Sequence, residues 1–172
     1  MWFNLQPVEL EFLESAPRRW VVEARLSASR SAVWDAFVDP ATWCHWFPGV
    51  LDVSYPEGPS PPGVGTRRFS HVGGQRYEET MLAWDEGVRW AYRIDRTTLP
   101  LSSAHIECTD FEDDGSGTCL RWTLAAKPRW MLRVVDPFME GVLHRLLARA
   151  ARNLDVHLME HGARFGERHH LS

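Results

Sequence analysis

The sequence predicts a single α+β domain in which a curved antiparallel sheet of about seven strands wraps around one long C-terminal helix. Three observations lead to this architecture. The middle of the chain alternates apolar and polar residues, with turn residues at hairpin spacing, which is typical of antiparallel strands. The last third instead repeats apolar residues at helical spacing. Two short helical segments separate the first strand from the others, and 172 residues fit one domain.

The composition excludes several classes of protein. No window approaches the apolar length of a membrane-spanning helix, and the first ten residues lack the basic and apolar regions of a secretory signal. The net charge is −4 and the basic residues are dispersed, which argues against a nucleic-acid partner. Three widely spaced cysteines without a CxxC motif indicate free thiols and a cytoplasmic protein. Nine tryptophans are unusual, because such large side chains need a core, an interface or a cavity.

The domain boundaries and the first strand follow from the pattern of apolar residues. We expect an N-terminal leader over residues 1–18, the domain over residues 19–162 and a C-terminal tail over residues 163–172. The alternation in Arg19–Leu26 predicts the first strand.

Two short helices are expected next. Ser27 or Ser29 can cap the first helix, because both residues precede an apolar face at helical spacing. The Asp39-Pro40 pair ends this helix, and Pro40 suits the first position of a second one that carries Trp43 and Trp46.

The remaining strands are recognised by their period of two and by the glycine-rich turns between them. A loop over residues 56–65, rich in proline and glycine, follows the first of them. The expected strands are Leu51–Tyr55, Thr66–Val72, Arg76–Trp84, Val88–Arg96, Ala104–Phe111 and Thr118–Ala126.

The long helix is expected to begin at Asp136-Pro137 and to end near Gly162. Asp suits the capping position and Pro the first turn of a helix. One broad apolar face is formed by Phe138, Met139, Val142, Leu143, Leu146, Leu147, Ala150, Leu154 and Leu158.

Several motifs in this order resemble one known superfamily. They are the segment VVEARLSASRSAVWDAFVDPATWCHWFPGV, the Gly63-Val-Gly-Thr-Arg-Arg start of a strand, the Gly117-Thr118 turn into LRWTL, and the terminal helix. From about Val21 to His161 the chain resembles the START-related helix-grip superfamily (SRPBCC), in its polyketide cyclase/dehydrase-like branch.

The resemblance implies a deep, mostly apolar cavity between the concave face of the sheet and the long helix. The expected function is binding, for transport or sequestration, of a small hydrophobic ligand such as a lipid, a polyketide or an aromatic metabolite. An alternative is a polyketide cyclase or dehydratase that uses the same cavity. A third possibility is a regulatory or toxin–antitoxin partner protein. The resemblance supplies no single catalytic motif, and the oligomeric state is left open.

Strand alternation predicts which side chains enter the cavity. In Thr66–Val72 the inward set is Arg67, Phe69 and His71, and a single bulge in Arg76–Trp84 would reverse the assignment there. The expected lining residues are Trp46, Phe69, Tyr77, Glu79, Met81, Trp90, Tyr92, Ile106, Trp122, Phe138, Val142 and Leu146.

Glu79, His71 and Tyr92 are the candidate catalytic residues. A carboxylate beside an imidazole in a cavity can act as a general acid–base pair. The competing interpretation is a cross-strand ion pair between Arg67 and Glu79 near a sheet edge, with His71 exposed to water.

The sequence predicts no metal site and no cofactor. His157 and His161 lie one helical turn apart, but the HExxH context of a zinc site is missing. A polar plug at the end of the cavity or an exposed last turn explains them better. The apolar segment around Trp130, just before the long helix, is expected to make at most a transient contact with a membrane or a partner.

Overall fold

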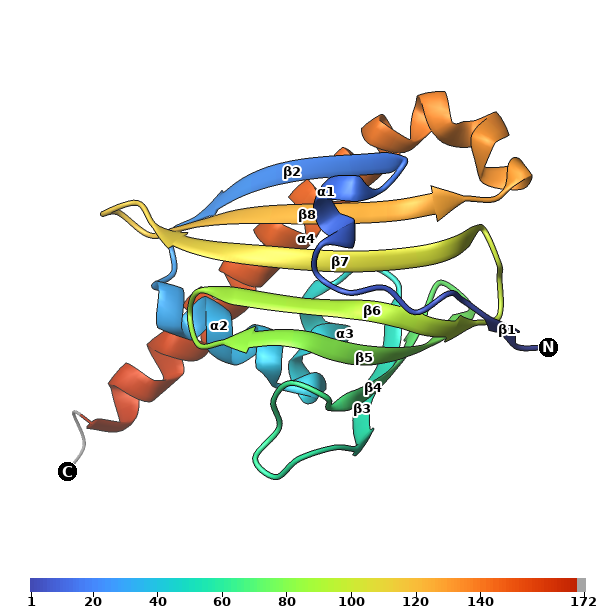
Figure 1. Cartoon of the computed structure of the whole chain (residues 1–172). Coiled ribbons are helices and arrows are strands. Elements are labelled where there is room, and N and C mark those ends of the chain that lie inside the picture. Colours follow the sequence, from blue (N-terminus) through green and yellow to red (C-terminus); the bar gives the residue numbers. More distant parts are fainter. Residues whose placement is uncertain (170–172) are drawn as a thin grey trace.

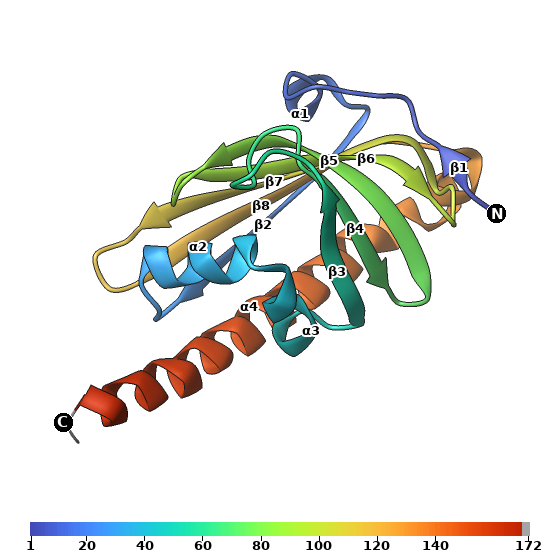
Figure 2. The same ribbon diagram turned by 90° about the horizontal axis from the view of Figure 1, so that it is seen from below.

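The computed structural model describes the backbone of residues 1–169 and the side chains of residues 1–130 and 138–160. A strongly curved antiparallel sheet, with strands in the order β2-β8-β7-β6-β5-β4-β3, curls around the helix α4, as predicted (Figures 1 and 2). In chain order the elements are β1 (Phe3–Asn4), α1 (Phe12–Ser15), β2 (Arg18–Leu26), α2 (Arg30–Val38), the 3-10 turn η1 (Pro40–Thr42), α3 (Trp43–Trp46), β3 (Val50–Glu57), β4 (Arg67–Val72), β5 (Gln75–Asp85), β6 (Arg89–Thr97), β7 (Ser102–Asp113), β8 (Thr118–Pro128) and α4 (Trp130–His169).

Side-chain caps mark the starts of α2 and η1. Of the two candidate caps for α2, Ser29 is the one used, since its hydroxyl accepts a hydrogen bond from the Ala32 amide at 3.4 Å. The Asp39 carboxylate accepts from the Ala41 amide at 2.9 Å and thereby starts η1. The chain therefore turns sharply between α2 and α3, which brings Trp43 and Trp46 under the sheet.

Helix α4 begins at Trp130, earlier than the Asp136-Pro137 pair had indicated. Pro137 lies inside the helix instead of opening it. A proline removes one backbone hydrogen bond and bends a helix, and the first turns of α4 lie at an angle to the rest in Figure 1. Of the expected tail, residues 163–172, no side chain belongs to the described part of the chain.

The main core fills the end of the sheet that α2 and α3 cover. Phe37 lies at its centre, buried among aromatic side chains from four other elements. The tryptophan excess is therefore mainly a packing feature of this core. Ring centroids 5.0 to 5.7 Å from that of Phe37 belong to Trp43, Trp46, Trp90, Phe111 and Trp122.

A second apolar cluster lies on the convex face of the sheet. Leu13 of α1 packs there against Ala83, Ile106 and Cys108, and α1 crosses in front of β7 and β8 in Figure 1. A register shift between Met81 and Ala83 places Met81 on the concave side and Ala83 on the convex side. The sheet thus buries apolar side chains on both faces.

Polar contacts hold α4 across the open side of the curved sheet. Asp155 of α4 accepts hydrogen bonds from the amides of Ser27 and Ala28, at 2.9 and 3.1 Å, and from the Ser27 hydroxyl. Asn153 donates to the Trp46 carbonyl at 3.1 Å. In the described part of the chain, no helix is long and apolar enough to cross a membrane.

Candidate functional site

A cavity of about 240 Å³ lies beside the aromatic core, between the concave face of the sheet and the stretch of α4 from Met139 to Leu147. Its walls are mainly apolar, and its polar side chains come from β4 to β7. The apolar lining residues are Leu5, Trp20, Trp43, Phe47, Val50, Val72, Ile94, Leu99, Leu101, Leu124, Ala126, Met139, Leu143, Leu146 and Leu147.

One polar group of the cavity is centred on Glu79 of β5. Arg68 Nη1 of β4 donates to Glu79 Oε2 at 2.7 Å, and the Ser70 hydroxyl donates to Oε1 at 2.9 Å. Both side chains of the ion pair are almost completely buried, at 2 and 3% exposure. Burial raises the pKa of Glu79 above its ordinary value, although Arg68 and Ser70 oppose that shift.

Aromatic rings surround the Arg68 guanidinium. Its central carbon lies 4.4 Å from the ring centroid of Trp43 and 5.1 Å from those of Trp90 and Tyr92. Cation–π contacts of this kind help to offset the cost of burying the charge. The guanidinium is therefore held in place by Glu79 on one side and by ring faces on others.

A second polar group is centred on Glu107 of β7. Tyr92 donates its hydroxyl to Glu107 Oε2 at 2.7 Å, Trp122 Nε1 donates to the same oxygen at 3.3 Å, and His105 Nε2 lies 3.3 Å from Oε1. Burial acts to raise the pKa of Glu107, but His105 and the hydrogen bonds from Tyr92 and Trp122 outweigh it and lower that pKa below its ordinary value.

The two carboxylates are thus shifted in opposite directions within one cavity. Burial raises the pKa of Glu79, whereas His105 and the hydrogen bonds from Tyr92 and Trp122 lower the pKa of Glu107. Burial also raises the pKa of Tyr92 well above its ordinary value, so its phenol stays protonated and acts as a donor. Such an arrangement can orient a polar ligand group, and carboxyl groups whose pKa values are pushed apart can divide acid and base roles.

Four of the residues expected to line the cavity do so: Tyr77, Glu79, Tyr92 and Leu146. Four others are buried in the main core but do not border the cavity, because the aromatic rings pack solidly against one another. These four are Trp46, Met81, Trp90 and Trp122.

The side chains of strand β4 face the opposite sides of the sheet from those expected. Arg68 lies opposite Glu79, and Ser70 lies opposite Tyr77, so Arg68 and Ser70 face the cavity. Phe69 therefore points to the convex side, where it contacts Trp2. Two of the inward positions of β4 carry polar residues, so apolar alternation does not reveal the inward face of this strand.

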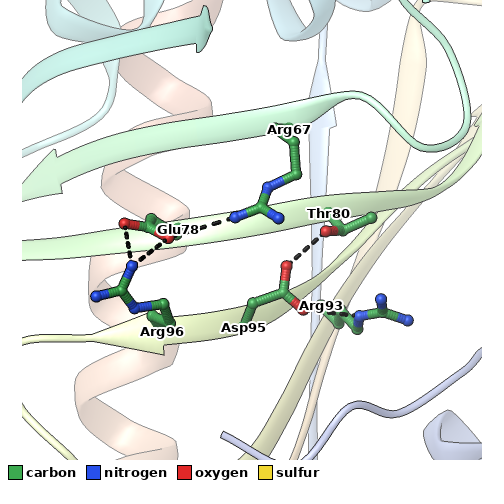
Figure 3. Close-up of polar contacts among 6 residues, drawn as sticks. All are labelled: Arg67, Glu78, Thr80, Arg93, Asp95 and Arg96. Carbon is green, nitrogen blue, oxygen red and sulfur yellow. Dashed lines mark hydrogen bonds and ion pairs between the residues drawn. The ribbon is translucent and has the colours of Figure 1, made fainter. Parts of the chain in front are cut away.

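The same reversal of β4 changes the partners proposed for Glu79. Arg68 forms the buried ion pair, whereas Arg67, the expected partner, binds Glu78 at 3.3 Å on the outer face (Figure 3). His71 pairs with Arg76 in the ladder and does not line the cavity.

Three further residues lie away from the cavity. Ile106 packs under α1 on the convex face. Phe138 and Val142 are 72% and 52% exposed. Successive helical residues are about 100° apart, so these two project away from the row that includes Leu143 and Leu147. The inward face of α4 is narrower than its apolar pattern indicated.

Sequence reasoning missed Arg68, Ser70, His105 and Glu107 as lining residues. In β7, the apolar alternation selects the face that includes Ile106 and Cys108, which α1 covers. His105 and Glu107 are alternate residues of β7, so the sequence did indicate a polar face on this strand. Assigning it to the cavity requires knowing that residues before β2 cover the convex face.

Of the two histidines singled out on α4, His157 does not line the cavity. The ring of His157 lies parallel to that of His45 of α3, with centroids 5.5 Å apart. His161 lies outside the described side chains. No group of three or more metal-ligating residues occurs within the described part of the chain.

The comparison with protein families agrees with this geometry. Residues 18–158 match the family model described as polyketide cyclase / dehydrase and lipid transport. The chain belongs to this family. None of the curated proteins compared with the chain matches it.

Several solved structures share the family's fold. A START superfamily protein from Mycobacterium smegmatis has a TM-score of 0.68 at 13% identity, covering 83% of this chain and 97% of that one. Protein CV1439 from Chromobacterium violaceum has a TM-score of 0.62 at 17% identity, covering 83% and 97%. The di-domain ARO/CYC protein BexL of the BE-7585A biosynthetic pathway has a TM-score of 0.66 at 18% identity, covering 82% of this chain and 50% of that one. At these identities the likeness establishes the fold alone.

Proposed function

We propose that this protein binds a small ligand with a largely apolar body in the cavity between the sheet and α4. The observation that carries this proposal is a cavity of about 240 Å³ with apolar walls and a polar side formed by β4 to β7. Burial of apolar ligand surface supplies roughly 25 cal/mol per Å². A filled interior would instead have favoured the third expectation, a regulatory or toxin–antitoxin partner.

The polar side of the cavity would orient the ligand. Gln75, Tyr77, Glu79, His105 and Glu107 border the same space, and most other lining residues are apolar. Buried polar groups need hydrogen-bond partners, so a ligand with a hydroxyl or carbonyl group fits better than a pure hydrocarbon. This supports a lipid, a polyketide or an aromatic metabolite, with its polar group directed towards β4 to β7.

Native mass spectrometry of the freshly purified protein tests the proposal. We expect a retained small molecule that is released on denaturation. The substitution Leu146→Trp places a larger side chain at the cavity wall and should abolish retention. Val142→Trp, one helical turn away on the exposed side of α4, is the matched control and should retain the molecule.

A negative result must be separated from loss of the ligand during purification. The apo protein is therefore titrated with straight-chain alcohols, and binding is followed by displacement of an anilinonaphthalene dye. Absence of a retained molecule, together with absence of alcohol binding to the wild type, would contradict the proposal.

A second candidate function is catalysis on polyketide-like substrates. The observation in its favour is the pair of buried carboxyl groups with oppositely shifted pKa values in one cavity. Such pairs can divide the acid and base roles of a reaction. With a synthetic poly-β-carbonyl substrate, Glu79→Gln should lower turnover by about a hundredfold or more. Equal turnover by the variant and the wild type would exclude this role for Glu79.

We further propose a transient contact between α4 and an anionic membrane surface. Trp130 and Phe138 are 73% and 72% exposed, and Phe138 directly precedes Met139, which lines the cavity. Three exposed arginines, Arg145, Arg149 and Arg152, continue the row of Phe138 along the helix. Exposed apolar side chains beside a cationic row fit an anionic bilayer.

Co-sedimentation with vesicles, with and without phosphatidylserine, tests this contact. Wild-type protein should pellet only with anionic vesicles, and Phe138→Glu should remain in solution. Val88→Glu is the control, because Val88 is similarly exposed at the turn between β5 and β6. Wild-type protein that does not pellet with anionic vesicles would contradict the contact.

A further inference from the structure

The sheet is open between β6 and β7 at the end that borders the cavity. The two strands pair from Arg89 opposite Asp110 to Arg93 opposite Ile106. Beyond this point they diverge. Ile94 and Thr97 on one side of the opening, and Ser102 and His105 on the other, all line the cavity.

The chain closes this opening with its own N-terminal residues, Phe3–Gln6, which we call the N-terminal strap. Phe3 and Asn4 form β1, which pairs with the end of β6. The Leu5 amide then donates to the Asp95 carbonyl of β6 at 2.8 Å, and the Gln6 amide donates to the Ser103 carbonyl of β7 at 2.7 Å. The strap therefore bridges both edges of the opening, and it enters the molecule between β6 and β7 in Figure 1.

Two outward-facing arginines of β6 contact residues on either side of the strap. Arg93 binds Glu9 at 2.6 Å as well as Asp95 at 2.8 Å. Arg96, which binds Glu78 at 3.1 Å, places its guanidinium 5.1 Å from the ring centroid of Trp2. Figure 3 shows Arg96 with Glu78 in one polar group and Arg93 with Asp95 in another, so two separate groups hold the two arginines that contact the flanks of the strap.

The side chain of Leu5 is the part of the strap that reaches the cavity. Leu5 is buried and lies among the lining residues. The family match begins only at residue 18, so this wall of the cavity lies outside the matched region.

We propose that Leu5 is a specificity-determining residue, because it forms the wall that limits the length of the ligand. This inference rests on the proposed binding function. A ligand that extends between β6 and β7 meets the Leu5 side chain. Shortening that side chain therefore lengthens the cavity in this direction without changing the polar groups that orient the ligand.

The test uses a homologous series of straight-chain alcohols, from hexanol to tetradecanol, with displacement of an anilinonaphthalene dye as the readout. Each added methylene tightens binding about fourfold until the chain meets the wall. For Leu5→Ala we expect the series to continue for about two or three further carbons, so the first alcohol that the wild type excludes binds roughly tenfold tighter or more.

Leu13→Ala is the matched control. Leu13 lies in the same N-terminal region and is as buried as Leu5, at 8% exposure each, but it packs on the convex face. The Leu13→Ala variant should lose about as much stability as Leu5→Ala, but it should keep the wild-type limit on alcohol length. A second variant, Leu5→Phe, should shorten the limit relative to the wild type.

The outcomes separate the inference from the proposed function. A length limit that moves with Leu5 but not with Leu13 supports the inference. If Leu5→Ala and Leu5→Phe still bind alcohols but keep the wild-type length limit, the inference about Leu5 is overturned. The proposed binding function would then remain intact. Absence of binding by every form would overturn the binding function, and the inference with it.

Discussion

At the level of single residues, Arg68 and Glu79 illustrate the free-energy cost of placing charged side chains at the wall of the cavity. Both charges are almost completely removed from water, and each is neutralised mainly by the other. A buried ion pair gains little over an apolar pair of the same shape, but loss of one partner leaves an uncompensated charge. The pair is therefore better explained by a role at the cavity than by a gain in stability.

A double-mutant cycle tests the energetic coupling between Arg68 and Glu79. Arg68→Met should lower the free energy of unfolding by about 3–5 kcal/mol, because Glu79 stays buried without its partner. The double variant Arg68→Met/Glu79→Leu should lose much less than the two single variants together. Urea unfolding of the four proteins measures these differences, and simple additivity would contradict the coupling.

The hydrogen bond from Tyr92 to Glu107 should make part of the protein's stability depend on pH. Because the pKa of Glu107 is lowered in the folded protein, its ionised form stabilises the fold above the ordinary value of 4.5, and this contribution is lost as the pH falls through the folded pKa. Tyr92→Phe removes a hydrogen bond to the charged form. The variant should lose about 1.5–3 kcal/mol at neutral pH, and less below the pKa of Glu107.

Urea unfolding of both proteins at neutral and at acidic pH measures this dependence. Tyr77→Phe is a suitable control, since the Tyr77 hydroxyl donates to Gln75 rather than to a carboxylate. A deficit in Tyr92→Phe that is the same at both pH values would contradict the assignment.

At the scale of elements, α4 and β7 differ in how much of their structure their own residues predict. Helix α4 repeats apolar residues over many turns, so its existence was predictable, but its inward face was not. Phe138 and Val142 are apolar and yet point outward. In β7 both faces are buried, one by α1 and one by the cavity. Alternation cannot identify the inward face of a strand that is covered on both sides.

The position of α4 depends on Asp155, which caps the turn between β2 and α2 from a distant part of the chain. Asp155→Ala leaves two amides of that turn without their acceptor and should lower the free energy of unfolding by about 1.5–3 kcal/mol. Arg152→Ala, an exposed neighbour on the same helix, should change it by about 0.5 kcal/mol or less. Chemical denaturation of both variants compares them, and equal values would contradict this role of Asp155.

At the scale of the whole molecule, the chain before β2 completes the domain. It covers the convex face through Leu13 and closes the sheet opening through Leu5. The excess of tryptophans is divided similarly between two places. Most of them fill the core around Phe37, and only Trp20 and Trp43 border the cavity.

Leu13→Ala tests whether the N-terminal region is an integral part of the domain. Removal of a buried leucine side chain should cost about 2–4 kcal/mol, from lost burial and from the space left behind. Leu51→Ala, at an exposed leucine, should have almost no effect. Thermal unfolding compares the two. A Leu13→Ala variant as stable as the wild type would show that this region packs only loosely on the sheet.

The sequence by itself determined the succession of strands and helices from β2 onward, the two candidate caps Ser27 and Ser29, and the family. These features are local, because they depend on periodicity, turn residues and capping side chains within a few positions. Only the tertiary structure decided that Arg68, His105 and Glu107 face the cavity and that Leu5 closes it. The reason is that side-chain direction in a strand reverses with a single shift in register, and the correct register depends on what covers each face of the sheet.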